Sequence, residues 1–172
     1  MKQWRIVSLL LLLLIIAGGT WLWWKKDESR RTSIQTLQRL DQALQTSNGS
    51  GLLDVVSLPA TIRDRTTAEQ TEFLTKALRD EISAEGLAVL QREGEFGSLT
   101  SLFPGEGQRW AEQAGVRAED CVAFKLERNG LCTEVVLAYD SALRTPNSPL
   151  KIIRCNNVKQ LAAQLSLTTS GS

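Results

Sequence analysis

The chain has 172 residues, of which 42% are hydrophobic and 23% are charged, and its formal net charge is +1. This composition is typical of a globular protein and gives no reason to predict disorder over most of the length. The sequence contains no histidine, which excludes Ser-His-Asp and Cys-His catalysis, histidine-ligated zinc and the usual histidine pH switch. It also lacks the P-loop, the dinucleotide-binding glycine pattern and the EF-hand loop. We therefore expect no catalytic, cofactor-binding or metal-binding residues.

The N-terminal segment Ile6–Trp24 is apolar and contains no charged residue over nineteen positions. As a helix it rises ~28 Å, which matches a hydrocarbon core of roughly 30 Å. Trp4 stands before the segment and three tryptophans close it, which is the placement expected at a membrane interface. We therefore expect residues 1–31 to form a membrane anchor with basic flanks.

A cleaved signal peptide is the alternative interpretation of the same segment. Cleavage after Gly19 would make the protein soluble and secreted. It would also leave Trp-Leu-Trp-Trp exposed to water near the new N-terminus, so an uncleaved signal anchor explains the apolar residues better. No cysteine follows the segment directly, so a lipid-modified N-terminus has no attachment residue.

The charges that flank the anchor bear on which side of the membrane the domain lies. Two basic residues, Lys2 and Arg5, precede the segment and four follow it. The larger number after the segment would favour a cytoplasmic domain. A five-residue tail ahead of an apolar segment is, however, typical of a signal anchor, and on this basis we expect an extracytoplasmic domain.

The rest of the chain, residues 32–167, is expected to form one soluble domain, followed by a disordered tail over 168–172. The first 31 residues hold six of the 20 Lys+Arg and two of the 19 Asp+Glu, so 14 basic and 17 acidic residues remain, a net charge of about −3. The basic residues are scattered singly instead of forming a stripe. Nucleic acid is therefore not expected as a partner.

Apolar spacing and capping residues predict the helices of the domain. Apolar residues at spacings of three and four predict a helix over 33–46 that faces the core, or alternatively a short coiled-coil stalk that forms a dimer. We expect residues 48–51, Asn-Gly-Ser-Gly, to end it. The sequence Thr66-Thr67-Ala68-Glu69 has the form of a capping box, Ser83 can cap a further helix, and Glu106–Ala114 is expected to be helical up to Gly115.

Three strands are predicted near the C-terminus. Two alternating runs over Cys121–Tyr139 flank Asn129-Gly130, the preferred centre of a type I′ turn, which sets Arg128 opposite Leu131. In this register one face is apolar, carrying Val122, Phe124, Leu126, Leu131, Val135, Leu137 and Tyr139, and the other is partly exposed to water. Residues 150–155 are expected to form a third strand antiparallel to the second, before a last helix capped by Asn156 or Asn157.

These elements predict an α+β fold in which an N-terminal transmembrane helix precedes a helical region, a C-terminal three-stranded antiparallel meander and a closing helix. The order of helices followed by a curved sheet resembles that of the cone-shaped NTF2-like domains, in element order only. What this resemblance implies is a pocket between helices and sheet. Fold analogy of this kind does not carry function.

The three cysteines allow one disulfide. Cys121 and Cys132 would lie about 20 Å apart along the hairpin and cannot pair. Cys132 begins the second strand and Cys155 ends the third, so a Cys132–Cys155 bridge is expected if the register brings them together in an oxidising compartment. The alternative is three small buried thiols.

Two functions of different classes follow from these observations. The first is a membrane-anchored, non-enzymatic protein that acts as an envelope interaction or accessory module and contacts a protein partner. The second is a small-molecule-binding or enzymatic pocket with Trp110, Phe124 and Tyr139 in its wall. Aromatic residues in such positions are more often part of the core.

Overall fold

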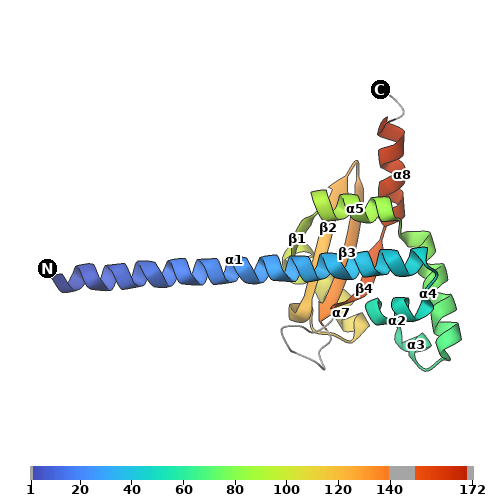
Figure 1. Ribbon diagram of the computed structural model, residues 1–172, viewed down its shortest axis with the longest axis horizontal. Coiled ribbons are helices and arrows are strands. Elements are labelled where there is room, and N and C mark those ends of the chain that lie inside the picture. Colours follow the sequence, from blue (N-terminus) through green and yellow to red (C-terminus); the bar gives the residue numbers. More distant parts are fainter. Residues whose placement is uncertain (1, 140–149, 170–172) are drawn as a thin grey trace. The chain divides into compact units, whose positions relative to one another are not determined.

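The computed structural model describes residues 2–139 and 150–169, without the side chains of residues 2–19, 21–23, 60 and 166–169. Its contacts divide the chain into two units, Met1–Thr32 and Ser33–Ser172. The second unit is a mixed domain of helices and one antiparallel sheet (Figure 1). The helix at its C-terminus, α8, covers Val158–Thr169, so the predicted tail begins within the bounds of α8 and its last three residues lie outside the described residues.

The first helix, α1, runs from Lys2 to Gln45. In the first unit, an ion pair at 2.7 Å joins Arg31 to Asp27, and the Thr32 hydroxyl donates to the Glu28 carbonyl at 3.0 Å. In the second unit, Leu37 and Leu40 are fully buried in the domain core. The predicted core-facing helix is therefore confirmed, although it is continuous with the residues before it.

The predicted membrane helix falls almost entirely on side chains that are not described. Within the described part of the chain, no helix is long and apolar enough to cross a membrane. Of residues 6–24, only Thr20 and Trp24 have described side chains, and both are exposed. The membrane anchor over 1–31 therefore stays a prediction.

A short helix follows where the sequence predicts only a helix end. Helix α2 spans Gly49–Val55, and the Asn48 side chain caps it by accepting a hydrogen bond from the Gly51 N–H at 3.2 Å. Asn48 therefore both follows α1 and begins α2. The four-residue helix α3, Ala60–Arg63, comes after Pro59.

Three further helix boundaries that the sequence predicts are confirmed. Helix α4 covers Thr67–Glu81 and begins at a capping box in which Glu69 N–H donates to the Thr66 hydroxyl at 3.4 Å and Thr66 N–H donates to the Glu69 carboxylate at 3.1 Å. Ser83 caps α5, Ala84–Glu93. Helix α7 covers Glu106–Ala114 and ends at Gly115, which has a φ of 71°. Shorter elements complete the helical part: α6, Leu99–Leu102, and the 3-10 turn η1, Ala118–Asp120.

The sheet has four strands, so the predicted count of three is wrong. The strands, in the order β1-β2-β3-β4, are all antiparallel to their neighbours and cover Glu95–Ser98, Cys121–Arg128, Leu131–Tyr139 and Leu150–Asn156. The additional strand, β1, is four residues long and contains Gly97. Glycine is depleted in strands, and β1 shows no alternation of apolar and polar residues that would predict a strand. Its backbone pairing with β2 makes it one.

The central hairpin has the predicted turn and register. Asn129 and Gly130 both have positive φ, 50° and 76°, which is the type I′ geometry. Arg128 lies opposite Leu131, and every pair up to Cys121 and Ala138 follows from this register. The face that carries Phe124, Val135 and Leu137 packs in the larger core, so the prediction of an apolar face is confirmed.

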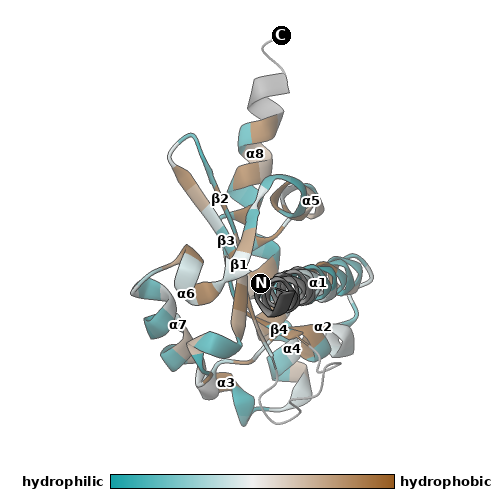
Figure 2. Cartoon of the chain, turned by 90° about the vertical axis from the view of Figure 1, so that its left-hand side faces the viewer, coloured by the Kyte–Doolittle hydropathy of each residue, from teal (hydrophilic) through white to brown (hydrophobic). Residues whose placement is uncertain are grey.

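The opposite face is partly exposed, as predicted, since Glu127 is exposed and Lys125 and Cys132 are half-buried, but the rest of it is covered by a second layer of helices that the sequence did not indicate. Ala123, Val136 and Ala138 are buried there against α6, α7 and η1. Figure 2 shows α6 and α7 on one side of the sheet and α2, α4 and α5 on the other. The domain is therefore a three-layer arrangement. We call the face toward the larger core face A and the face under α6 and α7 face B.

A β-bulge interrupts the regular alternation of β4. Val136 pairs with Arg154 and Leu137 pairs with Ile152, so Ile153 is an extra residue on β4. Ile152 and Cys155 consequently pack on face A, whereas Ile153 and Arg154 both lie on face B. A bulge places two successive side chains on the same side of a strand.

Candidate functional site

The predicted Cys132–Cys155 disulfide is not formed, since all three cysteines are free. The bulge explains why. Cys132 belongs to face B and Cys155, which pairs with Val135, belongs to face A. Val135 is three residues beyond Cys132, or about 10 Å along the strand, which exceeds the reach of a disulfide.

The thiols themselves are poor nucleophiles at neutral pH. Burial, more than any neighbouring charge, raises the pKa of Cys121 from 9.0 to about 11 and that of Cys155 to about 12. Burial also raises the pKa of the half-buried Cys132. The thiolate is the reactive form, and a catalytic cysteine has a lowered pKa that favours it. None of these three thiols has such a lowered pKa.

We expect iodoacetamide at about pH 8 to label Cys121 and Cys155 only after unfolding, and Cys132 in the native state. The folded pKa values of Cys121 and Cys155, about 11 and 12, exceed the unfolded value of 9.0. The two protonated thiols therefore contribute to the free energy of unfolding in full below pH 9, and this contribution is lost as pH rises toward 11 to 12. Intact-mass labelling measures the first effect and urea titrations at increasing pH the second. Two unreactive cysteines that remain unlabelled after unfolding without reductant would indicate a disulfide instead.

The three aromatic residues predicted in one pocket wall do not share a pocket. Phe124 is fully buried on face A and packs on Phe96 with ring centroids 4.9 Å apart. Trp110 lies on the other side of the sheet and packs on Phe103, also at 4.9 Å. Trp110 and Tyr139 each line a hollow, however, and these two hollows are adjacent.

These two hollows form the candidate site, which we name the β4-edge groove. They have volumes of about 320 and 400 Å³ and share four lining residues, Ser57, Leu58, Arg63 and Ile153. One wall is the segment between α2 and α3, and the other is α7 with Val116. The floor is β4, because the bulge turns Ile153 and Arg154 toward this side.

Arg154 is the most strongly positioned side chain of the groove. Its guanidinium lies 4.3 Å above the Trp110 ring, its Nε donates a hydrogen bond to Oε1 of Glu134 at 3.2 Å, and its Nη2 forms an ion pair with the same oxygen at 3.1 Å. The Glu134 carboxylate is 4% exposed and also accepts from the Asn156 amide at 3.0 Å. The Arg154 side chain is 38% exposed. Its guanidinium is therefore held in place by a buried carboxylate and is still accessible in the groove.

Two further cations line the same groove. Arg63 and Lys151 have no ion-pair partner within the described ranges. The Arg63 guanidinium donates only a long hydrogen bond, 3.5 Å, to the Leu58 carbonyl. Glu112 is the one carboxylate among the lining residues. Although the domain is acidic overall, the groove is therefore cationic.

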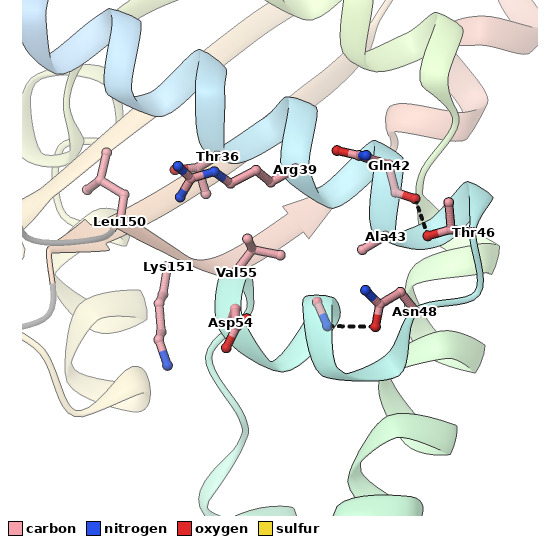
Figure 3. Close-up of a pocket in the computed structure, with 11 residues that line it drawn as sticks. Thr36, Arg39, Gln42, Ala43, Thr46, Asn48, Asp54, Val55, Leu150 and Lys151 are labelled. Carbon is pink, nitrogen blue, oxygen red and sulfur yellow. Dashed lines mark hydrogen bonds between the residues drawn. The ribbon is translucent and has the colours of Figure 1, made fainter.

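A separate cleft of about 650 Å³ lies between α1 and α2. Figure 3 shows that Arg39 comes from α1, Asp54 from α2, and Lys151 from the start of β4. Its other polar lining groups include the Asn48 side chain and Thr46, whose hydroxyl donates to the Gln42 carbonyl at 2.8 Å. We name it the α1–α2 cleft.

Sequence reasoning missed both hollowed surfaces, because each is assembled from segments far apart in the chain. Among the described residues, no group of three or more acidic or cysteine side chains could hold a metal ion.

No known family, curated protein or solved structure matches the chain.

Proposed function

We propose that this protein is a membrane-anchored, non-enzymatic interaction module whose domain binds a protein partner through the β4-edge groove. The observation that carries this proposal is the groove itself, an open cationic surface on an outer strand of the sheet. Arg154 is held there by a buried carboxylate and an aromatic ring, which supports a role in recognition, because a pre-positioned guanidinium costs less entropy on binding.

A non-enzymatic role is supported by the ionisable groups. The chain contains no histidine, and burial raises the pKa of all three thiols. Ion pairs such as Arg65 with Glu69 and Arg128 with Glu93 involve exposed side chains, where solvated charge is usual. Among the side chains that the structure describes, none of these groups has the environment that activates a general base or a nucleophile.

The membrane anchor is part of the same proposal and rests on Ile6–Trp24 and its flanking tryptophans. Trp24, at the end of that segment, leaves 57% of its surface exposed, as a side chain at a membrane interface can. Protease treatment of intact spheroplasts tests the placement. Loss of a C-terminal tag from the uncleaved protein would support an anchored extracytoplasmic domain, and a protected tag would contradict it.

Site-specific photo-crosslinking of the full-length protein in its own membranes tests the interaction. A photoreactive phenylalanine replaces Gln113, an exposed lining residue of the groove, and the matched control replaces Ala88, an exposed residue of α5. We expect a discrete adduct from position 113 and none from position 88. The same adduct pattern from both positions, or from neither, would contradict a partner at the groove.

A second candidate function is binding of a small molecule in the α1–α2 cleft. Its volume of about 650 Å³ falls in the range of ligand pockets. Polar groups from α1, α2 and β4 converge there, with Arg39 and Lys151 against Asp54. A thermal-shift screen of the full-length protein separates the two functions, because a pocket ligand raises the midpoint in the native protein and less so in Arg39→Glu.

A further inference from the structure

We infer that the β4-edge groove recognises an acidic, extended segment of the partner protein. This inference rests on the proposed function and names the chemistry of the partner. Three features of the groove support it: its length, the charge of its lining residues and the open edge of β4.

The groove fits a short extended chain. Its floor is the β4 stretch from Lys151 to Arg154, which spans roughly 10 Å at ~3.3 Å per residue. An extended segment of about four residues therefore covers it. Leu58 and Ile153 line both hollows, so one extended segment can pass from the first hollow to the second.

The charge of the groove selects an acidic occupant. Arg63, Lys151 and Arg154 line it against the single carboxylate of Glu112. Glu134 neutralises Arg154 from below, which leaves Arg63 and Lys151 uncompensated among the residues described. A basic segment would meet like charges here, and such juxtaposition disfavours the wrong partner.

The edge of β4 already accepts an extended segment of this chain. Val56 forms a parallel bridge with Ile152, and the Ser57 N–H donates to the Ile152 carbonyl at 2.8 Å. Beyond that bridge, no other backbone hydrogen bond to the outer edge of β4 occurs in the described part of the chain. A partner segment can therefore continue along the strand edge where Ser57 leaves it, which is the β-strand addition mode of peptide recognition.

Fluorescence anisotropy with labelled octapeptides tests the inference on the full-length protein in non-ionic detergent. The probes are alternating Glu-Thr, Lys-Thr and Gln-Thr peptides. We expect only the Glu-Thr peptide to bind measurably. Raising the salt concentration should weaken its binding, since screening acts on these partly exposed charges.

Three matched charge reversals locate the binding site. Arg63→Glu changes the groove alone, Arg39→Glu changes the α1–α2 cleft alone, and Lys76→Glu changes an exposed residue of α4 that lines neither. We expect Arg63→Glu to weaken the Glu-Thr peptide about tenfold, or about 1.4 kcal/mol, and the other two to leave it within about twofold.

Equal binding of the Glu-Thr and Lys-Thr peptides would overturn the inference, and so would an effect of Arg63→Glu no larger than that of Lys76→Glu. A greater loss in Arg39→Glu than in Arg63→Glu would place the acidic peptide in the α1–α2 cleft instead. Adducts from position 113 without binding of the Glu-Thr peptide would leave the proposed function standing and reject only the acidic segment. No adduct from either position would reject the proposed function itself.

Discussion

Arg154→Met is expected to destabilise the protein by about 2–3 kcal/mol, because it leaves the buried Glu134 carboxylate without its cation. The value is lower than for a fully buried pair, since the Arg154 side chain is 38% exposed. Methionine keeps an unbranched apolar stem against the Trp110 ring. The loss of stability is therefore due to the missing charge and not to lost packing. Urea titration followed by circular dichroism measures the change in the free energy of unfolding.

Arg128→Met is the matched control for this substitution. Arg128 pairs with Glu93 at 3.3 Å, and the two side chains are 36% and 39% exposed, so its loss should cost less than about 0.5 kcal/mol. Adding Glu134→Gln to Arg154→Met should recover about half of the loss, because a neutral amide needs no counter-charge. Equal effects of Arg154→Met and Arg128→Met would show that the Glu134 pair contributes no more than a surface ion pair.

Leu40→Ala is expected to cost about 3 kcal/mol, the usual range for emptying a fully buried leucine site. Leu40 is 0% exposed and lies in the same core cluster as Phe124 and Leu137, so the cavity opens in the centre of the domain. Gln38→Ala, an exposed position of the same helix, should change the free energy of unfolding by less than about 0.5 kcal/mol.

The same pair of variants separates the core-facing helix from a dimerising stalk. In a core-facing helix, Leu40→Ala lowers stability at every protein concentration. In a stalk, the loss would depend on concentration, because dissociation would precede unfolding. A midpoint that moves with protein concentration in the native chain but not in Leu40→Ala would contradict the burial of Leu40 within its own domain.

The elements that the sequence predicted correctly are those whose signals are local. Asn129-Gly130 determines its turn because few residue pairs tolerate positive φ at two successive positions. Thr66 with Glu69, and Ser83, satisfy the free N–H groups of a helix start within three residues. In each case the residues that carry the signal also make the contacts.

The elements that were missed depend on residues that are distant in the chain. β1 is too short to show alternation, and only its pairing with β2 makes it a strand. Asn48 begins an Asn-Gly-Ser-Gly run that is typical of a helix end, but its side chain caps the next helix, α2. The β4-edge groove combines residues 57–63, 110–116 and 151–154, and no pattern within one of these segments indicates the other two.

The extra residue in β4 gives that strand a tolerance that the other strands lack. If Ile153 were deleted, Lys151, Ile152, Arg154, Cys155 and Asn156 would alternate regularly and each would keep its present face. Removing one residue from the middle of β3 would instead exchange the faces of all the residues on one side of the deletion, moving buried apolar side chains across the sheet. Ile153 is therefore the position in this sheet at which a change of chain length can be absorbed without altering which side chains meet the core.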